Sequence, residues 1–301
     1  MSRVSVSPST GADVYVFADD HCPPHVHARH RGEGWVAWAG FSYVTDTARL
    51  ISMVPQRNVP PGPTLGVLLD DVAAALAGCR RAWWEIRVTA CLENRWMRQT
   101  TAGTVELLAA RGPGAEQVRE AHYDPGTCAL TLLAPGRDGD GHAGGIRDGG
   151  GVAMERKHDV GEAELARALE AGRHEAEREF RARSARYVPE LDAVEVVTAR
   201  DGGFLVPRRL VGALRDAPPE ALAGLEAWPD GSAIEVEALD VQVSVHGLLS
   251  AALPAMMPEG VIAGLFGRRG GQATSAAKGH SARENGRKGG RPKGQPAGQA
   301  A

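Results

Sequence analysis

The chain contains 301 residues, of which 43% are hydrophobic and 24% are charged, and its formal net charge is −3 at pH 7. This length is enough for one large domain or two small ones, each with a buried core. Nowhere does the sequence approach the ~20 consecutive apolar residues that cross a bilayer, and residues 1–10 lack the apolar core of a signal peptide. We therefore expect a cytoplasmic protein that makes no membrane contact.

Residues 12–94 are predicted to form a first module, in which strands precede a helix. Residues 13–18 and 35–38 have the apolar and aromatic content of strands, and a histidine-rich turn separates them. Between residues 65 and 83, apolar side chains recur three and four positions apart, which is typical of an amphipathic helix. Thr64 precedes this stripe, and its hydroxyl is the expected N-cap.

The middle of the chain has weaker patterns. Residues 95–134 contain short apolar runs typical of strands, and the pattern leaves open to which module they belong. Residues 135–151 include eight glycines, which predict a flexible linker. Residues 162–187 carry many Glu and Arg side chains three or four positions apart, which favours a polar helix.

Residues 189–257 are predicted to form a second small module. The apolar runs 194–197 and 204–206 flank the turn sequence Asp201-Gly202-Gly203, a pattern that indicates a β-hairpin. Prolines then bracket short helical pieces, before two more apolar runs that are typical of strands. The expected fold class is α+β, with two small modules of sheet and helix joined by the Gly-rich linker and the polar helix.

The C-terminal residues 267–301 form a basic tail. They contain eight Lys or Arg residues and one acid, Glu284, so the tail carries +7 and the rest of the chain −10. The tail has nine glycines and no apolar periodicity. It cannot bury enough surface to offset the entropy of ordering, so disorder is expected.

This tail predicts a contact with DNA. Its segment 287–293 has the Gly-Arg-Pro core of an AT-hook, an extended strip that binds the narrow minor groove of A·T-rich DNA. A tail that only improves solubility is the alternative. The residues expected to contact DNA are Arg283, Arg287, Lys288, Arg291 and Lys293.

The four cysteines are expected to be reduced thiols. None forms a CxxC pair, and their spacing indicates neither a disulfide framework nor a structural zinc site. Isolated thiols fit a cytosolic compartment. These residues are Cys22, Cys79, Cys91 and Cys128.

The turn after the first strand has an unusual composition. Three histidines surround a Pro-Pro pair in the sequence Asp-His-Cys-Pro-Pro-His-Val-His, residues 20–27. Together with the following helix and the tryptophans near its end, this motif resembles domain of unknown function family 4160 over residues 12–87. The resemblance implies a small bacterial α/β module.

Residues 189–253 resemble domain of unknown function family 2442, through the Asp-Gly hairpin, the Pro-bracketed helices and Leu239-Asp240. That family usually has Trp-Pro just before Leu-Asp, whereas this chain has Val236-Glu237-Ala238. Genes of the two families often lie side by side and resemble toxin–antitoxin pairs. The resemblance implies a toxin–antitoxin-like fusion that associates with nucleic acid; the alternative is a non-enzymatic DNA-binding regulator or an adaptor with a protein partner.

Alternation along an extended segment predicts that the imidazoles of His25 and His27 point to one face. His21 can return toward that face across the rigid Pro-Pro bend. The three imidazoles could then hold zinc with one position open to water.

Two explanations without a metal remain open for the same turn. In the first, the module is a ribonuclease-type hydrolase, where His25 and His27 exchange protons with RNA as acid and base. His21 and Arg29 would support them, and Asp19 or Asp20 would orient one imidazole. In the second, histidine and proline form a rigid hydrogen-bonded turn or a recognition surface.

Overall fold

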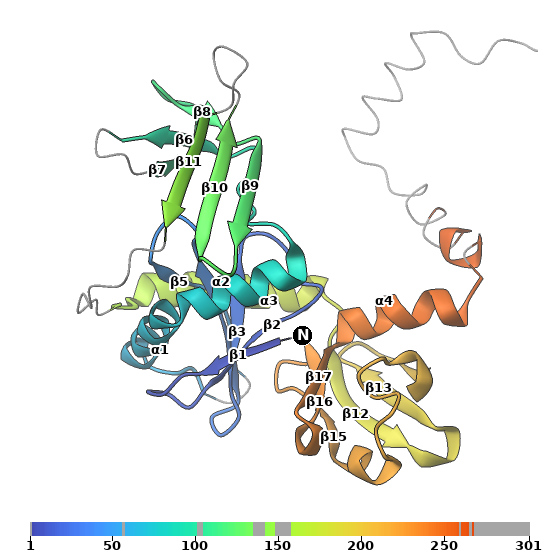
Figure 1. Ribbon diagram of the computed structural model, residues 1–301. Coiled ribbons are helices and arrows are strands. Elements are labelled where there is room, and N and C mark those ends of the chain that lie inside the picture. Colours follow the sequence, from blue (N-terminus) through green and yellow to red (C-terminus); the bar gives the residue numbers. More distant parts are fainter. Residues whose placement is uncertain are drawn as a thin grey trace, which may run out of the picture. The chain divides into compact units, whose positions relative to one another are not determined.

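The computed structural model describes residues 2–55, 58–100, 105–134, 142–147, 158–258, 260–264 and 267 (Figure 1). These residues form helices and several small antiparallel sheets, which confirms the α+β class. The chain divides into two compact units, Met1–Ser250 and Ala251–Ala301, and the features below belong to the first. The five tail residues expected to contact DNA lie outside the described residues.

A five-stranded antiparallel sheet forms the framework of the first module. Its strands pair in chain order: β1 (Ser2–Val6), β2 (Asp13–Val16), β3 (His25–His30), β4 (Trp35–Phe41) and β5 (Ala48–Pro55). Alternation along β3 places Val26 and Ala28 on one face, in the main hydrophobic core. His25, His27 and Arg29 therefore lie on the opposite face of the sheet.

Two helices follow the sheet, α1 (Gly62–Ala74) and α2 (Leu76–Arg87). Leu68 of α1 and Trp83 of α2 belong to the same core as the apolar side of β3. The prediction of one helix is wrong, because the chain bends by 71° between the two. Among the described residues, no single helix is long and apolar enough to cross a membrane, and this bent pair passes that test only as a pair.

The predicted N-cap is also wrong. Helix α1 begins at Gly62, and its N-cap is Pro61, which forms no side-chain capping bond. The backbone N–H of Thr64 donates to the Pro61 carbonyl, inside the first turn. Proline is well suited to the first helical turn because its φ is fixed and it has no N–H to satisfy, so Pro63 extends the helix backwards past Thr64.

The middle of the chain forms two three-stranded sheets. Strand β6 (Trp96–Gln99) pairs with β7 (Val105–Leu108) and β8 (Glu116–Gln117), and β10 (Ala129–Ala134) pairs with β9 (Glu120–Asp124) and β11 (His142–Arg147). The short strands expected over residues 95–134 are therefore present. Strand β11 lies within residues 135–151, and the prediction of a linker did not anticipate it.

Helix α3 (Glu162–Arg178) ends earlier than the predicted helix of residues 162–187. The residues after it form strand β12 (Ala182–Val188), which pairs with β13 (Ala193–Thr198). The Glu and Arg pattern favours a helix locally, but the pairing with β13 supplies hydrogen bonds that only an extended strand can make. Helix α3 packs closely on β5, where Gly172 lies against the backbone.

Replacing Gly172 with alanine is expected to destabilise the protein by about 1–3 kcal/mol, the range for overpacking a core. A Cβ atom there would lie 2.2 Å from the carbonyl oxygen of Met53, so α3 must move away from β5. The measurement is urea unfolding of the full chain. Gly78→Ala in α2 is the matched control, because its Cβ would lie 3.5 Å from Val4. Equal stability of the two variants would contradict this account of the packing.

The second module contains two three-stranded sheets and starts at β12. Strands β13 and β14 (Gly203–Pro207) form the expected hairpin, with Gly202 at φ +117° in its turn. The predicted helical pieces are 3-10 turns. The second sheet comprises β15 (Leu225–Ala227), β16 (Ala233–Val236) and β17 (Val241–Ser244), and helix α4 (Val245–Met256) follows.

Candidate metal centre

The turn that joins β2 to β3, residues 17–24, is the histidine turn of the sequence. It leads into β3, where the register places Tyr15 of β2 and Trp38 of β4 on either side of His27. Directly paired residues of an antiparallel sheet share a face, so these three side chains lie in one row. Both His25 and His27 project from this face, as alternation predicts.

Asp20, His25 and His27 bring three donor atoms together, within 4.8 Å of one another. The Asp20 Oδ1 atom lies 2.8 Å from Nε2 of His27 and 3.6 Å from Nε2 of His25. The other oxygen of Asp20 accepts the backbone N–H of Phe17 at 2.8 Å. All three side chains are buried, with His25 2% and His27 3% exposed. This group could hold a metal ion.

The orientation of His25 is set from both sides. Its Nδ1–H donates to the carbonyl oxygen of Pro23 at 2.8 Å, and its ring stacks on Trp38 with centroids 5.0 Å apart. A carbonyl can only accept, so Nδ1 carries the hydrogen and Nε2 of the neutral ring has a free lone pair. Within the described residues, this buried Nε2 makes no hydrogen bond. Metal-binding histidines are commonly held through their second nitrogen in this way.

The electrostatics of the group favour an ionised carboxylate. Burial alone raises the pKa of Asp20, but the charge of His27 and the proximity of both imidazoles outweigh burial and hold that pKa well below its ordinary value. Burial alone lowers the pKa of His25, but the Asp20 carboxylate and the Pro23 carbonyl outweigh burial and raise it. Asp20 is therefore charged at neutral pH, which is the state that binds a metal.

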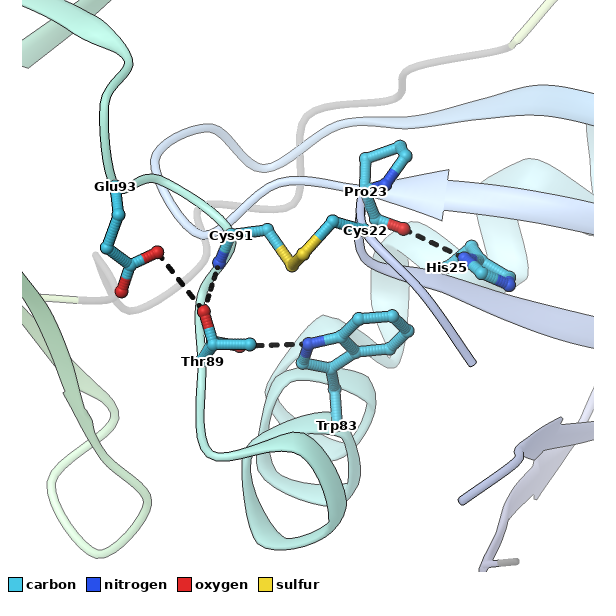
Figure 2. The surroundings of a disulfide bond; sticks show 7 residues. All are labelled: Cys22, Pro23, His25, Trp83, Thr89, Cys91 and Glu93. Carbon is cyan, nitrogen blue, oxygen red and sulfur yellow. Dashed lines mark hydrogen bonds between the residues drawn. A yellow bond between two sulfur atoms is a disulfide. The ribbon is translucent and has the colours of Figure 1, made fainter. Parts of the chain in front are cut away.

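A disulfide between Cys22 and Cys91 ties the histidine turn to the loop after α2 (Figure 2). The prediction of four reduced thiols is wrong for this pair. The two cysteines are 69 positions apart, and only the folded sheet brings their Cα atoms to 5.7 Å. The other two cysteines are free; burial raises the pKa of Cys79 to about 12, so that thiol is unreactive.

Figure 2 also shows the hydrogen bonds that hold the loop between α2 and Cys91. The indole N–H of Trp83 donates to the Thr89 carbonyl at 2.9 Å, and the Thr89 hydroxyl accepts the backbone N–H of Cys91 at 2.9 Å. Cys22 is followed directly by Pro23, whose carbonyl binds His25. A continuous chain of contacts therefore runs from the α2 core to the candidate metal ligand.

Two predicted site residues lie outside the donor group. His21 is exposed, and its ring centroid is 5.7 Å from that of His25, so Asp20 takes the place predicted for it among the metal ligands. The His21 ring lies beside this face, with its centroid 6.4 Å from that of Trp38, but its nitrogens are not part of the donor group. Arg29 is buried and pairs with Glu235 of β16. It does not line the cavity described below.

The contact of the second module with this face was not predicted. Trp228 lies beside Tyr15 and Phe17, with ring centroids 5.3 and 5.4 Å apart, and the Arg29 guanidinium lies 4.8 Å from its centroid. The indole N–H of Trp228 donates to the Glu235 carboxylate at 3.3 Å. The only feature of the sequence that indicated this contact is Glu235, an acidic residue within an otherwise apolar strand.

A cavity of about 420 Å³ borders the donor group. Asp20 and His27 form part of its wall, and Phe17 and Trp38 provide apolar surface. The rest of the wall comes from the histidine turn, from the end of α3 and from the second module. The remaining lining residues are Asp19, His21, Arg178, Glu179, Phe180, Ser232, Ser244 and His246.

No family model and no curated protein matches this chain. One solved structure that is similar is described as a protein of unknown function from Rhodospirillum rubrum ATCC 11170. It is 32% identical, and the match covers 26% of this chain and 98% of that chain, with a TM-score of 0.24. This match assigns no function to the chain.

Proposed function

We propose that this chain is a metal-dependent hydrolase of phosphate esters in nucleic acid, with Asp20, His25 and His27 as metal ligands. The convergence of their three donor atoms in a buried, preformed group is the observation that carries the proposal. RNA is the proposed substrate. The two modules would form a toxin–antitoxin-like fusion, in which the second module regulates the first.

Zinc is the ion assigned to the centre in this proposal. Two imidazoles and one carboxylate form a donor set that catalytic zinc sites use, with a further position open to water. Zinc held by these residues would act as a Lewis acid and would supply an activated water for hydrolysis.

The chain's own residues have distinct roles in this proposal. His25 and His27 bind through Nε2 and Asp20 binds through Oδ1, the atoms that already face one another. The Pro23 carbonyl keeps the His25 hydrogen on Nδ1, and Phe17 packs edge-on against His27 with centroids 4.6 Å apart. Both rings are therefore held before a metal arrives, and the cavity beside Asp20 and His27 would give a substrate access.

Titration of the metal-stripped full chain with zinc tests this proposal. We expect one zinc per chain, and His25→Gln or His27→Gln should weaken binding by about 100-fold, because each removes one of three protein ligands. His30→Gln is the matched control: it lies on the same strand, and its ring contacts Trp35. Equal zinc affinity of the control and the His25 variant would exclude the centre.

Activity is tested with the same proteins. The zinc-loaded chain should cleave an RNA oligonucleotide, and Asp20→Asn should abolish cleavage. If the full chain binds zinc but does not cleave RNA, the protein binds a metal and the proposal of a hydrolase is wrong.

The second candidate function is a non-enzymatic regulator or adaptor. The near-complete burial of His25 and His27 and the cover provided by Trp228 favour it. In this alternative, the histidine turn is a rigid scaffold and the chain binds partners without breaking a bond. The basic tail, with the five residues expected to contact DNA, belongs to both proposals.

A further inference from the structure

We infer that the cavity beside Asp20 and His27 binds a nucleoside phosphate, with Arg178 as the phosphate ligand. This inference rests on the proposed function and names its substrate class. A volume of about 420 Å³ lies within the range of ~300–1,000 Å³ that is usual for small-molecule sites. The cavity is therefore large enough for one nucleotide but is not a groove for a long strand.

Three segments that are distant in sequence build the cavity. The histidine turn contributes Asp19 and His21, the end of α3 contributes Arg178 and Phe180, and the second module contributes Ser232, Ser244 and His246. The site is incomplete without the second module. Within the first compact unit, the fusion of two modules thus creates a pocket that neither would form alone.

The carboxylates of the cavity wall are already engaged. Asp19 accepts the Ser244 hydroxyl at 2.8 Å, and Glu179 accepts the Arg181 guanidinium at 2.9 Å. Asp20 accepts from His27 and from the Phe17 backbone. The Arg181 cation partly offsets the charge of Glu179, and two imidazoles face Asp20, so these two acids repel an incoming anion less than free carboxylates would.

The donors of the wall are available instead. Within the described residues, the side chains of Arg178, His21 and His246 form no ion pair, and all three are exposed. A guanidinium and two imidazoles around one opening favour a ligand with several acceptor oxygens, and a phosphate fits both the guanidinium and a nearby metal.

Aromatic side chains provide the second half of the recognition. Phe180 is half-buried and presents a flat apolar surface to the cavity, whereas Phe17 and Trp38 are almost fully buried and contribute only apolar wall. Bases stack on such surfaces largely without regard to sequence, and stacking contributes ~1–3 kcal/mol per base. A ligand that carries both a phosphate and an aromatic base satisfies both sets of groups, whereas inorganic phosphate or a nucleoside satisfies only one.

Isothermal titration of the zinc-loaded full chain with adenosine 5′-monophosphate tests the inference. We expect adenosine and inorganic phosphate each to bind at least tenfold more weakly than the nucleotide. Arg178→Gln should weaken nucleotide binding about tenfold and leave zinc binding unchanged. Arg173→Gln is the matched control, because Arg173 lies on the same helix, is exposed and does not line the cavity. His246→Gln provides a second loss-of-binding variant.

The outcomes separate this inference from the proposed function. Equal nucleotide affinity of the Arg178 and Arg173 variants, or adenosine as tight as the nucleotide, would overturn the nucleotide pocket while zinc binding stands. Absence of zinc binding would overturn the proposed function, and the same titration of the metal-free chain would still test the pocket. A ten-residue oligoadenylate that binds more tightly than the mononucleotide identifies an RNA end as the source; equal or weaker binding identifies a free nucleotide.

Discussion

Replacing Arg29 with methionine is expected to lower the free energy of unfolding by about 3–5 kcal/mol, the range for breaking a buried ion pair. Arg29 is 3% exposed, and the side chain of its partner Glu235 is fully buried. The substitution leaves that carboxylate with the half-exposed Arg31 at 3.2 Å and the Trp228 indole at 3.3 Å. Urea unfolding of the full chain measures the loss.

Two further variants make this expectation specific. The double variant Arg29→Met with Glu235→Met should recover most of the lost stability, because no unpaired charge remains at the contact. Arg98→Met is the matched control: its pair with Glu106 is about half exposed on both sides, and such pairs contribute ~0–1 kcal/mol. A double variant as unstable as the single one would show that packing, and not charge, holds the contact.

Replacing Asp20 with asparagine is expected to destabilise the metal-free chain by about 3 kcal/mol, because it removes a buried charge that two imidazoles face. The effect should depend on pH. The depressed pKa of Asp20 contributes stability above the ordinary carboxyl pKa of about 4, and this contribution is lost as the pH falls. The raised pKa of His25 contributes stability below the ordinary imidazole pKa of about 6.5, and this is lost as the pH rises.

The stability difference between wild type and Asp20→Asn should therefore be largest at about pH 4–6.5, where both groups are charged in the folded chain. Urea unfolding with a chelator at pH 3, 5.5 and 9 measures it. Glu170→Gln is the control. The Glu170 pair with His174 is exposed, so this substitution should leave the pH profile of stability close to that of wild type. A difference that stays constant over this range would contradict the assigned electrostatics.

Local patterns predicted the parts of the site that lie close together in sequence. Two-residue alternation is enough to place His25 and His27 on one face of β3, because strand geometry does not depend on the rest of the fold. Asp19 or Asp20 was expected to orient an imidazole, and Asp20 does accept a hydrogen bond from His27. His21 does lie beside His25 and Trp38, but Asp20 takes its place in the donor group, and this depends on the tertiary contacts of the turn.

Contacts between residues that are distant in sequence could not be predicted from local sequence patterns. The Cys22–Cys91 pairing, the contact of Glu235 with Arg29, and the cavity residues from α3 depend on how the sheets assemble. The same limit explains why the α+β class was predicted correctly while the helix over residues 162–187 was too long. Strand pairing is a long-range event, and it replaced the last part of a segment with good helical character.

The disulfide has a topological consequence. The bond between Cys22 and Cys91 closes a covalent ring that contains β3, β4, β5 and both helices of the first module. Cutting the backbone once inside this ring leaves the two pieces joined through sulfur. The metal ligands on β3 would stay tethered to the α2 loop after such a nick, so an intact backbone is not required to keep the two ends of the module in one molecule.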